Sequence, residues 1–317
     1  MSANPFTADP GVALFFATFP AERKAEIQAE AARHVLRSAA AVSDNTGGVL
    51  LAADARRLVE QHDLGTVRTL MLLLLGQAQT YAQPPISNFF VGAVGLEAGT
   101  GNLVLGGNVE FVGTHLGLTL HGEGFVFTRA FSRGTTIEAI AIGEAHPCAH
   151  CRQYLSEFAA SPALELIDPL GHTLTLAQLF PWPFDPAYLG ESGAVPGKIL
   201  WPDLTLEGQA PHEEALLAAG RKAHSPYSRC PGAVVLEMAD GTLLSGASIE
   251  SVAFNPTIQP LQAGLVDLLA HGFAYGDIRS VSLGTVPGGA VDYAATTREL
   301  LAKVAPAASL HIAGWRP

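Results

Sequence analysis

The chain has 317 residues, about twice the ~150 residues expected of one domain, and its formal net charge is −11 from 18 basic and 29 acidic residues. Hydrophobic residues make up 48% and charged residues 15%, which excludes a disordered chain and leaves ample material for a buried core. The acidic balance, without a dense basic cluster, argues against nucleic acid and anionic membrane as partners.

Residues 1–82 are rich in Ala and Leu and predict a helical extension at the N-terminus. The first 20 residues contain no Lys or Arg, so the apolar stretch 12–16 lacks the positive flank of a signal peptide. The apolar run 70–75 is far shorter than the ~20 residues needed to cross a bilayer. A low and odd number of cysteines argues against a secreted disulfide scaffold; they are Cys148, Cys151 and Cys230. We therefore expect a cytoplasmic protein.

The chain repeats itself at a spacing of 140 residues. Ten of the 21 positions 92–112 are identical to the position 140 residues further on, and the shared residues include the pairs Gly92 and Gly232, Glu97 and Glu237, and Glu110 and Glu250. Two unrelated strands would not share so much, so the chain is predicted to contain two copies of one domain.

The first copy, at 83–165, is expected to alternate strands with helices. Apolar runs at 91–96 and 103–105 predict a β-hairpin, and a helix at about 121–131, a strand at 136–142 and a helix at 148–160 follow. The second copy, at 212–317, shows the same order, with expected elements at 233–238, 243–245, 261–270, 278–283 and 296–304. This alternation predicts an α/β fold, a three-layer α/β/α domain duplicated in tandem.

Between the copies, eight prolines fall within residues 161–211. Such a density predicts a Pro-rich connector at 166–211 with little regular structure, and not a third domain.

Two short motifs carry the chemistry, His121-Gly122-Glu123 and Pro147-Cys148-Ala149-His150-Cys151. Two cysteines three residues apart at a helix start place both sulfurs where the N–H groups and the helix dipole favour thiolates. Zinc prefers thiolate and imidazole ligands, and three protein ligands leave a fourth position for water, as in catalytic sites. Zinc lowers the pKa of bound water to roughly 7, and Glu123 is close enough to move its proton without ligating the metal. We predict a catalytic zinc held by His121, Cys148 and Cys151.

A Cys-x-x-Cys pair alone is equally typical of a redox motif or of half a structural zinc site, and those alternatives stay open for the pair by itself. The repeat offers an internal comparison, because the counterparts of the three ligands and of Glu123 are Leu261, Gly288, Val291 and Ala263. The second copy therefore cannot hold this zinc. We predict one zinc per chain and a structural role for the second copy.

Together these motifs resemble the cytidine deaminases in their larger, two-domain homodimeric form. The resemblance runs from about residue 80 to 300 and includes Ser87-Asn88-Phe89-Phe90-Val91-Gly92-Ala93, Gly107-Asn108-Val109-Glu110-Phe111 and Pro147-Cys148-Ala149-His150-Cys151-Arg152-Gln153, with Ser225-Pro226-Tyr227-Ser228 and Ala253-Phe254-Asn255-Pro256-Thr257 in the second copy. It implies hydrolytic deamination of the small nucleosides cytidine and 2′-deoxycytidine, with Zn²⁺ as the cofactor and Glu123 as the catalytic proton carrier.

The resemblance also implies roles for further residues. Asn108 and Glu110 match the residues that hold the ribose hydroxyls, and Phe89 matches an aromatic that packs against the pyrimidine. Arg152, beside the second thiolate, is expected to offset sulfur charge. Phe184 lies in a segment that resembles Leu-Pro-x-x-Phe-Gly-Pro and would reach the substrate of the partner in a homodimer.

The chain departs from the family pattern at two positions, where Gly122 replaces the usual Ala and Ala149 the usual Gly. Neither removes a ligand, and the backbone of Gly122 can still meet the base, but flexibility there rises. One alternative is therefore a deaminase of a modified or different amino-pyrimidine, with Gly122 opening space beside the base. Another is a zinc-stabilised binding module without turnover, which the presence of Glu123 disfavours.

Overall fold

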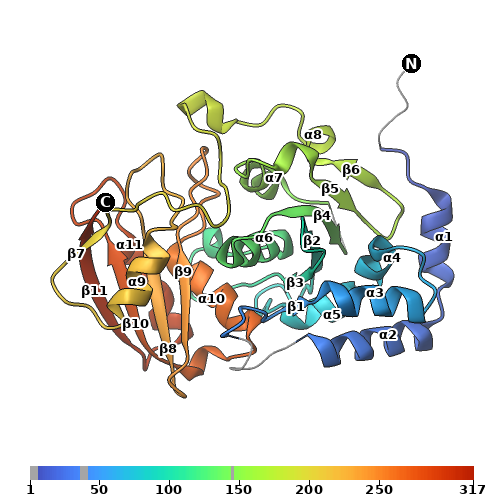
Figure 1. Cartoon of the computed structure of the whole chain (residues 1–317), viewed down its shortest axis with the longest axis horizontal. Helices are drawn as coiled ribbons and strands as arrows, with labels where there is room; N and C mark the ends of the chain where they lie inside the picture. The colour runs from blue at the N-terminus through green and yellow to red at the C-terminus, as the bar shows by residue number, and fades with distance from the viewer. Residues whose placement is uncertain (1–5, 36–41, 144–145) are drawn as a thin grey trace.

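The computed structural model describes residues 6–35, 42–143 and 146–317, and it contains two mixed β-sheets that lie side by side (Figure 1). The strands of the first sheet are β1 (Val49–Leu50), β2 (Gly92–Glu97), β3 (Leu103–Gly107), β4 (Ile137–Ile142), β5 (Glu165–Ile167) and β6 (Thr173–Thr175). Those of the second are β7 (Thr205–Glu207), β8 (Ala233–Met238), β9 (Leu243–Ala247), β10 (Ile278–Thr285) and β11 (Ser309–Arg316).

The helices of the first half are α1 (Pro10–Thr18), α2 (Ala21–His34), α3 (Ala52–Gln61), α4 (Val67–Leu73), α5 (Leu75–Ala78), α6 (Gly122–Arg133), α7 (Ala149–Leu155) and α8 (Leu176–Leu179). Those of the second half are α9 (Glu213–Gly220), α10 (Pro260–Ala270) and α11 (Tyr293–Val304). Within the described part of the chain, no helix is both long enough and apolar enough to span a membrane.

Four strands of each sheet, β2–β5 and β8–β11, share one topology, which confirms the tandem duplication, and a fifth strand from the connector pairs beside them in each sheet. In the order β3-β2-β4-β5-β6, neighbouring strands pair antiparallel, antiparallel, parallel and antiparallel. The order β9-β8-β10-β11-β7 shows the same sequence of pairings. The expected hairpins are present as β2–β3 and β8–β9.

Helices cover both faces of each sheet, as the three-layer prediction requires. A Cβ built on Gly92 of β2 would lie 2.2 Å from the Leu75 carbonyl oxygen of α5, whereas one built on Gly95 would lie 2.5 Å from Val126 of α6. Since residues three apart in a strand face opposite sides, α5 and α6 lie on opposite faces, and glycine allows both close approaches. In the second half, α10 packs on one face of β8 and α9 covers the other.

The N-terminal extension is helical, as expected, but it also completes the first sheet. Its short strand β1 pairs antiparallel with β3, so that Val49 lies opposite Val104. This strand has no counterpart in the second sheet.

The Pro-rich connector has more regular structure than its composition suggested. It contributes β6 and α8 to the first half and β7 to the second sheet, where β7 pairs with β11. The expected helix at 148–160 is also shorter and ends at Leu155. The Ser156 hydroxyl bonds back to the Arg152 carbonyl at 2.8 Å, and the chain turns so that Phe158 packs against Phe127 at 5.0 Å between ring centroids.

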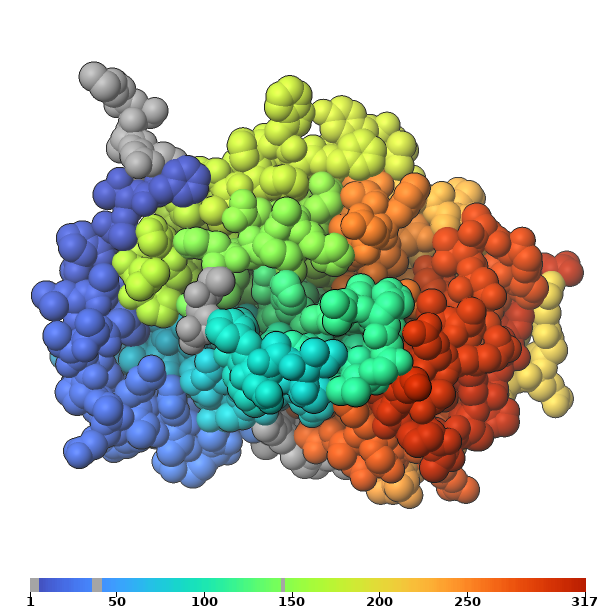
Figure 2. Space-filling view, turned by 180° about the vertical axis from the view of Figure 1, so that it is seen from behind, coloured from blue at the N-terminus to red at the C-terminus, as the bar shows by residue number. Residues whose placement is uncertain are grey.

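The two halves share a continuous hydrophobic core in which α6 lies against α10 (Figure 1). A buried ion pair joins these helices, with Arg129 Nη1 2.8 Å from Asp267 Oδ1. On the opposite side of the molecule, loops that follow β3 lie against the second half (Figure 2), where Phe111 contacts Tyr275 at 6.4 Å between ring centroids.

Candidate active site

The three predicted zinc ligands converge at the starts of two neighbouring helices. His121 immediately precedes α6, Cys148 caps the N-terminus of α7, and Cys151 lies in the first turn of α7. The Nδ1 atom of His121 lies 3.6 Å from the Cys148 sulfur and 3.4 Å from the Cys151 sulfur. A tetrahedral zinc with ordinary bond lengths would separate such a sulfur and nitrogen by about 3.5 Å. The residues therefore fit a zinc ion as they stand.

The electrostatics of the two sulfurs also suit a cation. The Cys151 side chain and the His121 ring both hydrogen-bond to the Cys148 sulfur, and they lower the pKa of Cys148 well below that of an ordinary thiol. The pKa of Cys151 is raised, because it shares a site with the Cys148 thiolate and is buried. The two sulfurs lie within 4.8 Å of each other. Two thiolates so close repel each other unless a cation lies between them, and a thiol that coordinates a metal ion is deprotonated outright.

Glu123 lies in the first turn of α6, and its carboxyl hydrogen-bonds to the Cys151 side chain. Its side chain is only 4% exposed, and burial raises the pKa of this carboxyl above its ordinary value. A carboxyl whose proton affinity is raised in this way is suited to accept and return protons near neutral pH.

A cavity of about 430 Å³ opens onto the ligands, which is a size typical of small-molecule sites. It is lined by Ser87, Phe89, Val91, Asn108, Glu110, Thr119, His121, Glu123, Ile142, His146 and Cys148. The structure thus brings Phe89, Asn108 and Glu110 together with the metal ligands and Glu123.

Asn108 and Glu110 both hold the loop that carries Phe89. The Asn108 side-chain amide donates to the Phe89 carbonyl at 2.8 Å and accepts from the Val91 N–H at 2.9 Å. One oxygen of Glu110 accepts from the N–H groups of Ile86 and Ser87, each at 2.9 Å, and the other accepts from the Ser87 hydroxyl at 2.6 Å. These two side chains therefore shape the cavity as well as line it.

Gly122, Arg152 and Phe184 occupy different surroundings. A Cβ on Gly122 would lie 3.1 Å from the Ala93 Cβ of β2, so a methyl group here would press on the sheet. The Arg152 guanidinium donates to the carbonyls of Pro147 at 2.7 Å and Leu179 at 3.1 Å, and so supports Cys148 through the backbone. Phe184 is half exposed and does not line this cavity of its own chain. Its ring stacks on that of Tyr188, with the ring centroids 5.6 Å apart.

The second half supports the site through Gln262, which the sequence analysis did not single out, and through Asn255, which lies in one of the stretches that resemble the cytidine deaminases. Gln262, on α10, donates a buried hydrogen bond of 2.8 Å to the carbonyl of Leu118, three residues before His121. His150, between the two cysteines, contacts the Asn255 carbonyl at 3.2 Å. Their distance in sequence from the motifs they contact gave no local signal. Only the spatial packing of the halves reveals them.

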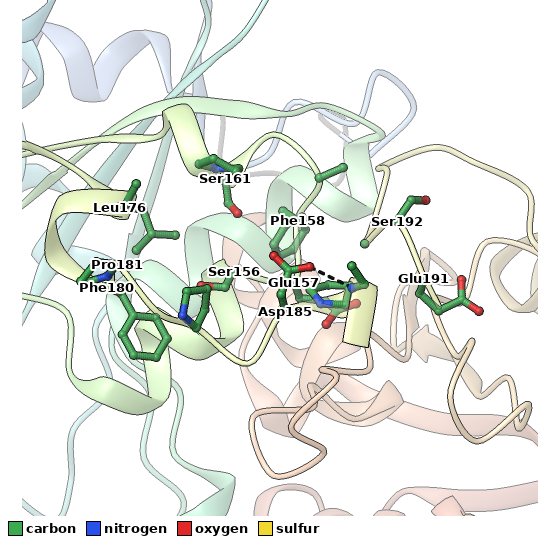
Figure 3. A pocket seen from close by; sticks show the side chains of 17 residues that line it. Ser156, Glu157, Phe158, Ser161, Leu176, Phe180, Pro181, Asp185, Glu191 and Ser192 are labelled. Atoms are coloured by element: carbon green, nitrogen blue, oxygen red, sulfur yellow. Dashed lines mark hydrogen bonds between the residues drawn. The ribbon is translucent and has the colours of Figure 1, made fainter. Parts of the chain in front are cut away.

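A separate cavity of about 320 Å³ lies between the end of α7 and the connector (Figure 3). Glu157, in its wall, is fully buried and binds the second half: its carboxylate accepts from Tyr227 at 2.7 Å and from the Val252 N–H at 2.8 Å, and it pairs with His224 at 2.7 Å. This buried carboxylate is a structural link between the halves.

The zinc site has no counterpart in the second half. The positions equivalent to His121 and Glu123 hold Leu261 and Ala263, which are buried in the core. Among the described residues, the two groups that could hold a metal ion both lie in the first half.

Comparisons with known proteins support the division of the chain into two related copies. A family model described as "Cytidine and deoxycytidylate deaminase zinc-binding region" matches residues 66–163, and a second model with the same description matches 197–298. The cytidine deaminase of Shewanella amazonensis is 35% identical over 248 residues, which are 78% of this chain and 81% of that protein. That of Vibrio atlanticus is 33% identical over 238 residues, or 75% of this chain and 80% of that protein.

Among solved structures, cytidine deaminase from Mycobacterium tuberculosis is 33% identical and covers 37% of this chain and 96% of its own, with a TM-score of 0.33. The two family matches together span more than half of the chain, and each falls on one copy of the repeat. The chain therefore belongs to the cytidine and deoxycytidylate deaminase family.

Proposed function

We propose that this enzyme catalyses the hydrolytic deamination of cytidine and 2′-deoxycytidine, giving uridine or 2′-deoxyuridine and ammonia. The observation that carries the proposal is the buried carboxylate of Glu123, which lines a nucleoside-sized cavity together with His121 and Cys148, two members of the group that could hold a metal ion. A site that only held zinc for stability would have no use for such a group.

Zinc bound by the three ligands would supply Lewis acidity, making water acidic enough to act as a nucleophile near neutral pH. Glu123 accepts the proton that the water loses and delivers it to N3 of the base. The hydroxide oxygen bonds to C4 of the base. Glu123 then moves the proton of the new C4 hydroxyl to the amino group, which leaves as ammonia while the C4 carbonyl forms, so that one carboxyl serves as base and then as acid. Its burial excludes bulk water, which keeps these transfers local.

Recognition of the nucleoside is assigned to the cavity walls. Asn108 and Glu110 provide an amide and a carboxylate for the ribose hydroxyls, and Phe89 provides an aromatic surface for the pyrimidine. The backbone of Gly122 faces the base. Because a methyl group at Gly122 would point towards Ala93 of β2, its absence gives little support to a widened cavity for a modified pyrimidine.

Arg152 acts in this proposal by holding the backbone ahead of Cys148 and by adding positive charge near the thiolates. Phe184 completes the nucleoside site of a partner in a homodimer. Its exposure supports this role, since neighbouring connector side chains such as Trp182 and Tyr188 are also exposed and form an apolar surface. The backbone of Phe184 is fixed on both sides by Gln153 of α7, at 3.1 and 2.7 Å.

We further propose a cytoplasmic protein that acts on free nucleosides. The net charge of −11 gives no electrostatic attraction for polynucleotides, whereas uncharged nucleosides need none.

An ultraviolet absorbance assay of the zinc-loaded protein with cytidine, 2′-deoxycytidine and cytosine tests the proposal. We expect turnover of the two nucleosides. We also expect Glu123→Gln to abolish turnover while zinc remains bound. Glu138→Gln, the same change at an exposed position on β4, is the matched control and should leave activity intact. The absence of any absorbance change at full zinc occupancy would rule out the proposed reaction.

A further inference from the structure

A second group of metal-ligating side chains lies beside the active site. It consists of His146, two residues before Cys148, and of Asp168 and His172 in the turn between β5 and β6. The Asp168 Oδ2 atom lies 3.4 Å from Nε2 of His146 and 2.8 Å from Nδ1 of His172. All three ligand atoms lie within 4.8 Å of one another.

The carboxylate of Asp168 is held in place before any ion arrives. Its side chain is largely buried, and its Oδ1 atom accepts hydrogen bonds from the backbone N–H groups of Leu170 at 2.9 Å and His172 at 3.0 Å. These bonds fix the rotation of the carboxylate and leave Oδ2 directed at the two imidazoles. Orienting hydrogen bonds of this kind are typical of built metal sites.

The ligand set determines the kind of ion. Two imidazoles and one carboxylate suit zinc and neighbouring divalent transition metals, whereas magnesium and calcium prefer oxygen ligands throughout. Nitrogen and oxygen ligands of a tetrahedral ion lie about 3.3 Å apart. The 3.4 Å between His146 and Asp168 fits this value, whereas the 2.8 Å between His172 and Asp168 would have to lengthen. The two rings lie edge to face with centroids 5.3 Å apart, which leaves their ligating nitrogens on the side of Asp168.

We propose that His146, Asp168 and His172 form a second, weaker binding site for a divalent transition-metal ion. It shares no ligand with the site formed by His121, Cys148 and Cys151, and its open positions face solvent because His146 is exposed. His146 also lines the nucleoside cavity, so a bound ion would tie one wall of that cavity to the β5–β6 turn. The proposal does not depend on the reaction assigned above.

Calorimetric titration of Co²⁺ into enzyme that holds one equivalent of zinc, at His121, Cys148 and Cys151, tests this site. We expect one further equivalent to bind without release of zinc and without the near-ultraviolet absorbance that thiolate ligation of cobalt produces. Asp168→Asn and His172→Gln should each weaken this binding by more than about tenfold, while the zinc held by the cysteines stays at one equivalent.

His34→Gln is the matched control, because His34 forms a similar, partly exposed pair with Asp54 at 3.5 Å, and among the described residues this pair belongs to no group of three that could hold a metal ion. This variant should bind Co²⁺ like the parent protein. Circular dichroism confirms that each variant is folded. The proposal is wrong if the zinc-loaded protein binds no Co²⁺, if the two substitutions leave binding unchanged, or if the bound cobalt shows thiolate absorbance and zinc is displaced.

Discussion

Glu110 and Glu250 stand 140 positions apart and make matching hydrogen bonds in the two halves. Each carboxylate accepts from two consecutive backbone N–H groups and from one serine hydroxyl, with Ser87 as the partner of Glu110 and Ser228 as that of Glu250. Their pKa values nevertheless shift in opposite directions. Burial dominates at Glu250 and raises its pKa, whereas at the more accessible Glu110 the hydrogen bonds outweigh desolvation and lower it.

The first prediction separates substrate binding by Glu110 from the support of a loop, which Glu110 and Glu250 both provide. Glu110→Gln should raise KM for cytidine by about tenfold or more, since charge-assisted hydrogen bonds of 1.5–3 kcal/mol hold the loop and the substrate. Glu250→Gln should leave KM unchanged and lower the free energy of unfolding. Steady-state kinetics and urea titrations of both variants measure this. Equal changes of KM in the two variants would show that Glu110 acts only through the fold.

The second prediction concerns the pH dependence of stability. Glu97, fully buried at the end of β2, would have a raised pKa from burial alone, but hydrogen bonds from Arg133, Thr135 and Asn102 lower its pKa to about 2. Because the folded-state value lies below the ordinary 4.5, the stabilisation is present above about pH 4.5 and is lost as the pH falls towards 2. It is on the order of 3 kcal/mol.

Urea unfolding of the parent and of Glu97→Gln between pH 3 and pH 7 measures this contribution. The variant should be the less stable protein at pH 7 and should lose less stability on acidification. Glu237 is the repeat counterpart and lies in more accessible surroundings, so Glu237→Gln should change the pH dependence less. If the free energy of unfolding changes with pH in the same way in the parent and in Glu97→Gln, the Glu97 carboxylate does not supply this pH-dependent stabilisation.

The third prediction addresses the buried pair between α6 and α10. Arg129→Met should cost about 3–5 kcal/mol, because it leaves the carboxylate of Asp267 buried without its partner. The double variant with Asp267→Leu should cost less than the sum of the single changes, since no charge then remains unpaired. Thermal and urea unfolding of the parent, the two single variants and the double variant give the free energies of a double-mutant cycle. If the losses of unfolding free energy are additive, Arg129 and Asp267 are not energetically coupled.

The fourth prediction links the zinc-less half to zinc retention. Gln262→Met leaves the carbonyl of Leu118 buried without its donor, which costs about 1–3 kcal/mol and loosens the segment before His121. Zinc release to a chelator should therefore become faster. Gln28→Met is the matched control, because Gln28 makes the same kind of bond, 2.7 Å to the Leu73 carbonyl, within the N-terminal helices. Equal release rates from the two variants would refute a specific role for Gln262.

The zinc site and the two-copy fold could be predicted because their signals are local. The spacing of Cys148 and Cys151, the pair His121 and Glu123, and the alternation of the hairpin strands each occupy a short stretch of sequence. The repeat then supplied a comparison within the chain, in which Leu261, Gly288 and Val291 stand at the positions of the three ligands.

What could not be predicted depends on contacts between distant segments. Strand β7 lies in the connector yet pairs with β11, the last strand of the second half. Strand β1 ends at Leu50, 42 positions before the next strand of its sheet begins at Gly92. The apolar spacing around Phe158 resembles a helix, but that residue is buried through a turn. Gln262 and Glu157 act on partners more than 60 residues away, and periodicity carries no information about them.

The position of the connector strands has a consequence for the covalent continuity of the chain. Between β6 and β7 the backbone passes through exposed residues that include Tyr188, Gly190 and Ile199, and every strand of the first sheet lies before this stretch and every strand of the second after it. A break in the peptide chain there would leave both sheets whole. The apolar contacts of α6 with α10 and the carboxylate of Glu157 would still join the pieces, so the two halves could be synthesised as separate polypeptides and assemble by complementation.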